Sequence, residues 1–251
     1  IANSSTGFDA DTLRIPSIVI SSEEKIFVSY TRYMGDDRNA MIISVANGSF
    51  EDCAKSGITS EWNDIYVSDH FSSASKSSGG GGRLIISDNE EFLYFAVGYG
   101  DMNFNSEEYP VSSQLIENSF GKTYRYDLTT KTLSLMSKGH RNVQGLAELD
   151  SNVYSSEHGP QGGDEINKLI MGGNYGYPIQ SYGTDYGIYS WPYDNKEFSN
   201  IDKTSFREPF FVFTPSIAPS SMSFVKSFHR KWDGDLLLTT LKAQSIYRIK
   251  I

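Results

Sequence analysis

Short stretches in which apolar and polar residues alternate recur along the chain, and polar turns separate them. The stretch 15–20 leads through the polar turn 21–24 into a second alternating stretch at 25–30. Similar strand–turn–strand units cover residues 83–98, 144–156 and 221–240. Alternation with a period of two places apolar side chains on one face of a strand, and polar turns suit tight connections. The pattern therefore predicts four β-hairpins.

A third strand follows two of these hairpins, at 121–127 and 245–251, and both strands contain Tyr-Arg before a large apolar or aromatic residue. The unit repeats every roughly 60 to 75 residues, and β-repeats of this kind indicate a propeller. A β-sandwich is the alternative. No long amphipathic helix is visible, which disfavours most α/β folds. We expect one all-β propeller domain over residues 1–251 with about four blades, either part of a larger ring or an unusually closed one.

Composition excludes some partners. The formal net charge of −9 argues against nucleic acid, whose phosphates require a basic surface. No run approaches the roughly 18 apolar residues of a membrane span.

Cys53 is the only cysteine, so no internal disulfide can form. The chain starts at Ile1 with polar residues and shows no signal peptide, so we expect a mature or trimmed product.

Residues that are unsuited to a core but suited to a site gather in three segments, 139–146, 157–167 and 172–178. The first segment offers planar or amide groups with several hydrogen-bond donors: Arg141, Asn142 and Gln144. The second contains the adjacent carboxylates Asp164 and Glu165, and the pairs Gly159-Pro160 and Gly162-Gly163. Glycine-rich backbone exposes carbonyl oxygens, which suit a hard cation such as calcium.

These three segments closely resemble motifs of the soluble quinoprotein glucose/sorbosone (aldose sugar) dehydrogenase family. The family patterns G-x-R-N-x-Q-G-L, E-x-G-P-x-x-x-D-E-I-N and G-x-N-Y-G-W-P are matched nearly in full, with Tyr177 in the Trp position. Shorter similarities lie at 82–84, 120–122, 217–220 and 237–242. The resemblance implies a six-bladed propeller that binds pyrroloquinoline quinone (PQQ) and calcium and oxidises aldoses at C1 by hydride transfer. The chain would correspond to roughly its second through fifth blades.

The resemblance also implies roles for individual residues. Four would hold the quinone: Arg141, Asn142, Gln144 and Lys242. Two would ligate the cofactor-bound calcium through backbone carbonyls: Gly159 and Pro160. A further calcium would be held by Glu165 and the carbonyl of Tyr175. Asp164 would orient the catalytic base.

The chain departs from the family at the position of that base. The family has a histidine four residues before the arginine of its Gly-Arg-Leu strand, and here this position is Gly79, which cannot accept a proton. A displaced loop that carries His70 back to the site is one interpretation, and a surface histidine is the other. Without the resemblance, Arg141 and Asp164 would be interpreted as a buried ion pair. We expect His140 and His158 to brace loops rather than to do chemistry.

Two functions follow from these observations. The first is a PQQ- and calcium-dependent aldose sugar dehydrogenase with a small sugar as its substrate. The second is a catalytically silent, calcium-binding propeller that binds a carbohydrate or a protein, which the glycine at position 79 favours. The retained donor set favours the enzyme. The resemblance further implies a periplasmic or extracellular location, and exposed blade edges make a homodimer plausible.

Overall fold

The computed structural model of this 251-residue chain describes residues 16–46, 51, 62–72, 81–99, 111–184 and 202–251. The elements that lie within these ranges are 17 β-strands and two 3-10 helices, η2 (Val111–Ser113) and η4 (Lys203–Ser205). The expectation of an all-β fold is therefore confirmed. No helix within the described ranges is long and apolar enough to cross a membrane.

The strands form four sheets, one for each predicted unit. The first sheet has the order β1 (Ser17–Ile20), β2 (Ile26–Gly35), β3 (Arg38–Ala46) and β4 (Trp62–Val67), and β5 (Phe71–Ser72) pairs with β3. The second has the order β6 (Gly81–Ile86), β7 (Phe92–Val97), β8 (Lys122–Asp127) and β9 (Leu133–Lys138), with β13 (Gly173–Asn174) added parallel to β9.

The third and fourth sheets follow the same plan. The third has the order β10 (Val143–Leu149), β11 (Asn152–Glu157), β12 (Asp164–Lys168) and β14 (Phe211–Phe213). The fourth has the order β15 (Pro219–Phe224), β16 (Leu236–Thr240) and β17 (Ser245–Ile249). All four predicted hairpins are confirmed as antiparallel pairs, β1–β2, β6–β7, β10–β11 and β15–β16. The two predicted third strands are β8 and β17.

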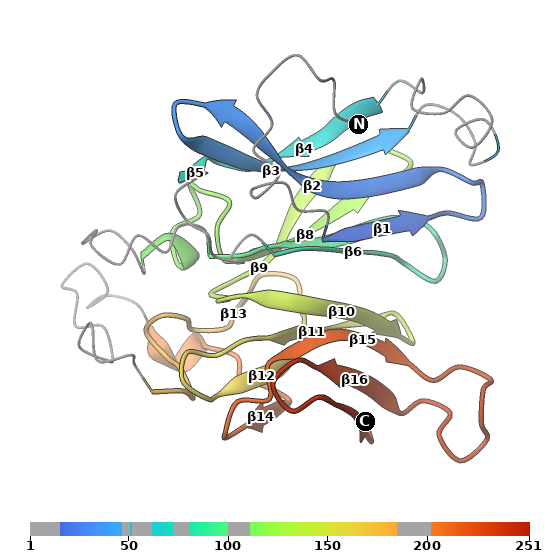
Figure 1. Ribbon diagram of the computed structural model, residues 1–251, viewed down its shortest axis with the longest axis vertical. Helices are drawn as coiled ribbons and strands as arrows, with labels where there is room; N and C mark the ends of the chain where they lie inside the picture. The colour runs from blue at the N-terminus through green and yellow to red at the C-terminus, as the bar shows by residue number, and fades with distance from the viewer. Residues whose placement is uncertain (1–15, 47–50, 52–61, 73–80, 100–110, 185–201) are drawn as a thin grey trace.

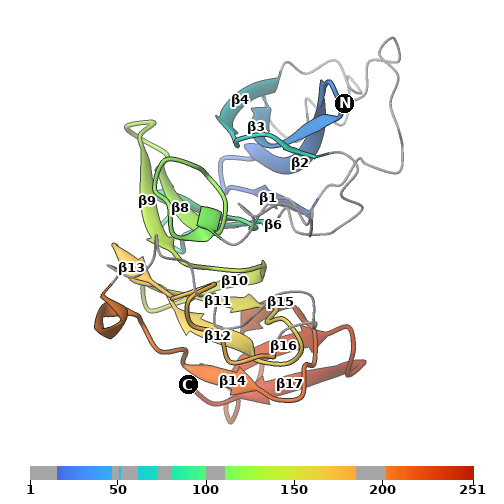
Figure 2. The same cartoon turned by 90° about the vertical axis from the view of Figure 1, so that its left-hand side faces the viewer.

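The four sheets follow one another in space as they do in the sequence. The first strand of each sheet lies beside the first strand of the next, so that β1 contacts β6, β6 contacts β10, and β10 contacts β15. Figure 2 shows the sheets as an arc that runs from β1–β4 through β6–β9 and β10–β12 to β15–β17. Radial succession of small antiparallel sheets is typical of propeller architecture. The number of blades in a complete ring stays a prediction.

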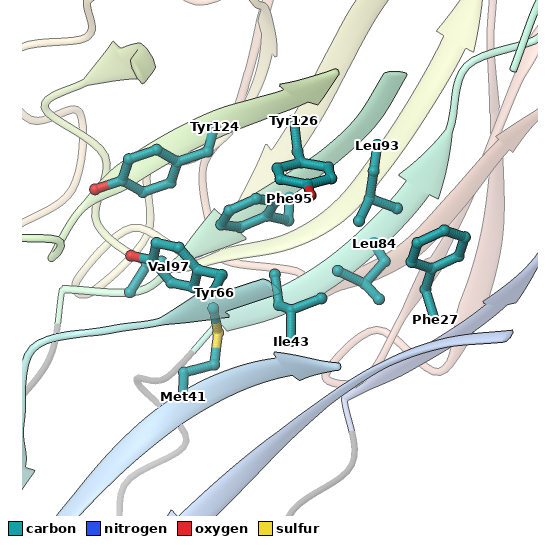
Figure 3. Packing of buried hydrophobic residues seen from close by; sticks show 10 residues of the cluster. All are labelled: Phe27, Met41, Ile43, Tyr66, Leu84, Leu93, Phe95, Val97, Tyr124 and Tyr126. Carbon is teal, nitrogen blue, oxygen red and sulfur yellow. The ribbon is translucent and has the colours of Figure 1, made fainter. Parts of the chain in front are cut away.

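Three hydrophobic clusters fill the spaces between successive sheets. In β7, Leu93, Phe95 and Val97 belong to the cluster between the first two sheets, which Figure 3 shows. The alternate residues Tyr94 and Ala96 belong to the cluster between the second and third sheets. Both faces of β7 are therefore buried, which explains why its sequence is a continuous apolar run rather than an alternating one. Burying one such side chain contributes about 2 kcal/mol.

Buried or partly buried side chains also tie each sheet to the next through backbone carbonyls. The hydroxyl of Ser29 on β2 donates to Gly82 O on β6 at 2.5 Å, and Ser156 on β11 donates to Ser220 O on β15 at 3.0 Å. Arg83 Nε on β6 donates to Gln144 O on β10 at 2.9 Å. The strands approach so closely that a Cβ at Gly145 would lie 2.5 Å from Ser220 O. These bonds fix how the site-bearing connections face one another.

The two ends of the sheets differ. Short turns at 21–25, 87–91, 150–151 and 225–235 lie at one end, which we call the turn end. Residues 98–99 and 111–121 and the connections 139–142, 158–163, 214–218 and 241–244 lie at the other, which we call the site end. In Figure 1 the hairpin turns lie on the right and the site-end connections on the left. All three sequence segments singled out for chemistry contribute to the site end.

Candidate functional site

Asp164, the first residue of β12, organises two connections of the site end. Its side chain is fully buried. Oδ1 accepts a hydrogen bond from Gly159 N at 3.0 Å. Oδ2 accepts three bonds of 2.8 Å, from the hydroxyl of Ser216 and from the backbone N–H groups of Ile217 and Ala218. The carboxylate therefore holds the 158–163 connection against the 214–218 connection, because several donors compensate the buried charge.

Arg141 lies on the other side of the same connection. Its Nη1 donates to His158 O at 3.1 Å and to Gly159 O at 2.9 Å. The guanidinium lies over the Tyr99 ring, 4.9 Å from its centroid. No bond joins Arg141 to Asp164, so the simple ion pair that their types suggest is not formed. The His158–Gly159 peptide is instead held from both sides, by the Asp164 carboxylate at its N–H and by the Arg141 guanidinium at its carbonyl.

Glu157, the last residue of β11, braces the backbone of Arg141. Its Oε2 accepts from Arg141 N at 2.7 Å, and its Oε1 accepts from Asn167 Nδ2 at 2.7 Å and lies 2.9 Å from His140 Nδ1. The other ring nitrogen of His140 is 2.8 Å from the Ser137 hydroxyl. His140 is fully buried within this network. It braces the 139–142 connection, as its position in the motif predicted.

His158 has the same kind of role. Its Nε2 lies 2.7 Å from Pro219 O, which links the 158–163 connection to the start of β15. Burial lowers the pKa of His158, so its imidazole is neutral near pH 7 and Nε2 carries the proton that Pro219 O accepts. This bond supports the expectation that His158 holds a loop in place.

Glu165 and Tyr175 were assigned together to a calcium site. The Glu165 carboxylate accepts from Asn167 Nδ2 at 3.0 Å. Burial, and then the nearby Glu157, raise the pKa of Glu165 well above its usual range. A small cavity of about 10 Å³ is lined by both of these carboxylates and by Gly159 and Pro160, and Tyr175 is not part of its lining. That volume is about enough for one water molecule or one ion.

Tyr175 packs by its ring and its hydroxyl. The ring stacks on His140 with centroids 4.6 Å apart, and the hydroxyl accepts from Ile170 N at 3.2 Å. The same hydroxyl donates to Lys168 O. Burial raises the pKa of Tyr175 to about 12, so the phenol stays protonated. The assignment of its carbonyl to calcium stays a prediction.

The remaining quinone-binding candidates lie at the same end but differ in exposure. Asn142 is buried, and its Oδ1 accepts from Gln144 Nε2 at 2.7 Å. Lys242 is exposed in the β16–β17 turn. Its backbone N–H donates to Ile217 O at 3.1 Å, so this turn rests on the segment that Asp164 holds. The structure thus brings Asn142, Gln144 and Lys242 to the end of the sheets that carries Arg141.

Two residues were considered in connection with the catalytic base, Gly79 at the family's base position and His70 as its replacement. Gly79 lies outside the described residues. His70 is exposed between β4 and β5, and Asp164 bonds only to the 158–163 and 214–218 connections. The predicted orientation of His70 by Asp164 therefore has no contact that supports it.

Three residues of the site were given no role from the sequence alone. Tyr99, whose ring packs against the Arg141 guanidinium, follows β7 and does not belong to any recognised motif. Ser216 stands just before the similarity at 217–220, and only its contact with Asp164 gives it a role. Glu157 opens the second motif, and its carboxylate at the end of a strand was the one available signal.

Comparisons with known proteins identify two characterised relatives of this chain. The aldose sugar dehydrogenase YliI of Escherichia coli is 33% identical over 115 residues, which are 45% of this chain and 30% of that protein. Quinoprotein glucose dehydrogenase B of Acinetobacter calcoaceticus is 28% identical over 161 residues, 45% of this chain and 34% of that protein. These matches span about a third of the length of either relative.

A crystal structure shows the same fold. The soluble aldose sugar dehydrogenase of Escherichia coli, in its apo-form, superposes with a TM-score of 0.72 over 92% of this chain and 66% of that one, at 24% identity. Residues 18–251 match the family described as Glucose / Sorbosone dehydrogenase. Nearly the whole chain, including every described strand from β2 onward, lies within that match. The chain therefore belongs to the glucose/sorbosone dehydrogenase family.

Proposed function

We propose that this chain carries part of the active site of a PQQ- and calcium-dependent aldose sugar dehydrogenase, which oxidises a small sugar at C1. One observation carries the proposal. The carbonyls of His158 and Gly159 converge on a cationic group, the Arg141 guanidinium, in a connection that the buried Asp164 holds rigid. Two relatives, aldose sugar dehydrogenase YliI and quinoprotein glucose dehydrogenase B, support the same class of reaction.

The donor set of the 158–165 segment fits calcium. Calcium prefers carboxylate and backbone carbonyl oxygens. A Cβ at Gly159 would lie 2.2 Å from Gly162 O and 2.4 Å from Gly163 O, so carbonyls crowd this connection. Among the described residues no group of three or more His, Cys, Asp or Glu could hold a metal. A calcium would therefore depend on the carbonyls of Gly159 and Pro160, and a second on Glu165 with the Tyr175 carbonyl.

The donor set of Arg141, Asn142, Gln144 and Lys242 fits a quinone that carries several carboxylates. Guanidinium, amide and ammonium groups pair with carboxylate and carbonyl oxygens through charge-assisted bonds. When bound, the quinone would supply a two-electron acceptor for the hydride from C1 of the sugar. The chain's residues would bind its carboxylates, fix its plane and exclude water from one side.

The second candidate function is a catalytically silent propeller that binds calcium and a carbohydrate or protein. The position of His70 favours it, because this exposed imidazole has no contact with Asp164, whose acceptors are used by loop donors. A base supplied from elsewhere would be needed for proton removal from the sugar. Under either candidate, a periplasmic or extracellular location remains a proposal that follows from the family, and a homodimer remains a proposal that follows from exposed blade edges.

Reconstitution of the full chain distinguishes these functions. Purified protein is titrated with PQQ and calcium, binding is followed by calorimetry, and dye reduction is then assayed with a panel of aldoses. Binding with turnover supports the dehydrogenase, and binding without turnover supports the silent propeller. Absence of PQQ binding overturns the quinoprotein proposal. Removal of calcium by a chelator should lower the melting temperature by several degrees, since a ligand of the native state stabilises it. An unchanged melting temperature argues against a calcium held by Glu165 and the Tyr175 carbonyl.

A further inference from the structure

Arg141 and Gly159 were assigned to different ligands, yet the structure joins them directly. The resemblance gives the guanidinium to the quinone and the Gly159 carbonyl to calcium. In the structure Nη1 of Arg141 lies 2.9 Å from Gly159 O and 3.1 Å from His158 O. The carbonyl that would ligate the divalent cation is therefore already used by a monovalent one.

Two cations that share one acceptor oppose each other. Calcium binds oxygen at about 2.3 to 2.6 Å, so an ion on Gly159 O would lie only a few ångströms from the guanidinium. Arg141 is buried, and little water lies between the charges to screen them. An arginine remains protonated at any ordinary pH, so the repulsion cannot be relieved by loss of a proton.

The surroundings prevent an easy retreat of Arg141. Glu157 holds its backbone N–H at 2.7 Å, and the Tyr99 ring supports the guanidinium. Asp164 holds Gly159 N at 3.0 Å, which keeps the His158 carbonyl, on the opposite side of the same peptide, directed toward Arg141. Relief must come from a change at the guanidinium itself, either rotation of the side chain or neutralisation by an anion.

We propose that Arg141 has a second role, which is to oppose cation binding at Gly159 until an anionic ligand takes up its charge. The inference rests on the proposed function, because that function supplies an anionic ligand, the carboxylate-bearing quinone. An anion that binds Arg141 frees the carbonyls of His158 and Gly159 and adds negative charge beside them. Calcium and quinone then bind with positive coupling, and by linkage each raises the affinity for the other by the same factor.

The decisive measurement is calcium affinity in the absence of any quinone. Calorimetric titration with calcium chloride is done on the wild type and on Arg141→Gln. If Arg141 opposes the ion, Arg141→Gln binds calcium at least tenfold more tightly than the wild type. Equal or weaker binding in Arg141→Gln overturns the inference. An arginine that only binds the quinone would not lower the calcium affinity of the quinone-free protein.

Three variants make the test specific. Arg141→Lys keeps the charge and should keep the weak calcium binding. Arg83→Gln removes a partly buried guanidinium that bonds a different backbone carbonyl, Gln144 O, and should leave calcium affinity unchanged within twofold. A gain in Arg83→Gln equal to that of Arg141→Gln would show a general charge effect and overturn the local role. If Arg141→Gln does not fold, Arg141→Met replaces it, since its side chain can still pack on Tyr99.

A second titration separates this inference from the proposed function. In the presence of saturating PQQ, wild-type affinity for calcium should rise by a larger factor than that of Arg141→Gln. Failure of the wild type to bind PQQ would remove the proposed function, whereas the quinone-free comparison of the two proteins would still decide whether Arg141 opposes the cation.

Discussion

The turn end and the site end of the sheets are built by different kinds of contact. At the turn end, polar side chains form hydrogen bonds with residues that are close in sequence. Ser87 Oγ accepts from Phe92 N at 2.9 Å, and Asp127 Oδ1 accepts from Thr129 N at 2.9 Å. Contacts between turns are exposed, such as the 2.5 Å pair of Lys226 and Asp88. At the site end, the buried Asp164 bonds Ile217 N across 53 positions of sequence.

This difference decides where single substitutions have large effects. An exposed ion pair is screened by water and contributes about 0 to 1 kcal/mol. A buried carboxylate that satisfies several donors contributes far more, because its removal leaves those donors without partners. The site end therefore combines the functional groups of the molecule with its largest polar contributions to stability.

The largest expected effect comes from Asp164→Ala. The substitution leaves the N–H groups of Gly159 and Ile217 unsatisfied and leaves Ala218 N–H with only its 3.3 Å bond to Ser216 Oγ. We expect a loss of about 4 kcal/mol in the free energy of unfolding. Urea denaturation followed by circular dichroism measures it. The matched control is Asp88→Ala at the turn end, for which we expect about 0.5 kcal/mol. Equal losses for the two variants would contradict the distinction between the ends.

Glycines with left-handed backbone give a second comparison. Gly163 has φ +66° and its Cβ would lie 2.1 Å from Gly183 N, whereas Gly172 has φ +75° and open space around its Cβ. Gly163→Ala should cost about 3 kcal/mol through a backbone clash, and Gly172→Ala only about 1 kcal/mol through backbone strain. Thermal melting of the two variants ranks them. If Gly172→Ala lowers the melting temperature more than Gly163→Ala does, the 158–163 connection is not packed as tightly as the structure shows.

The smallest of the three effects concerns the buried Lys122 on β8. Its Nζ donates to Ser112 O at 2.7 Å and also to Phe120 O, and so holds the segment 111–121 at the site end. Burial, and then the charge of Lys138, lower the pKa of Lys122 to about 7. The unfolded chain then binds more protons than the folded one above pH 7, so stability should rise with pH until the ordinary lysine pKa of about 10.

Lys122→Met isolates this contribution. The wild type should gain about 2 kcal/mol relative to Lys122→Met between pH 7 and pH 9, measured by urea denaturation at each pH. A difference between the two proteins that stays flat over this range would mean that the lysine titrates normally in the folded state. Lys131→Met in an exposed turn is the control, and its difference from the wild type should not change with pH.

Particular residues show how far sequence reasoning reaches. The polar turn from Asp88 to Glu91, between two apolar stretches, predicted the β6–β7 hairpin, because both the turn and its strands are set by neighbours in sequence. The motif around Arg141 identified the family, since spacing within a segment survives in the sequence. The contact of Arg141 with Gly159 O could not be predicted, because the two residues are placed by separate connections of two sheets.

The sequence by itself determined the all-β class, the four hairpins, the family and the motif segments that contribute to the candidate site. These properties depend on local periodicity and on motif spacing, which lie within single segments. Only the tertiary structure decided that Asp164 joins two connections rather than pairing with Arg141, and that Arg141 binds the carbonyl assigned to calcium. The reason is that a buried charge finds its partners by proximity in space, which depends on how whole sheets pack.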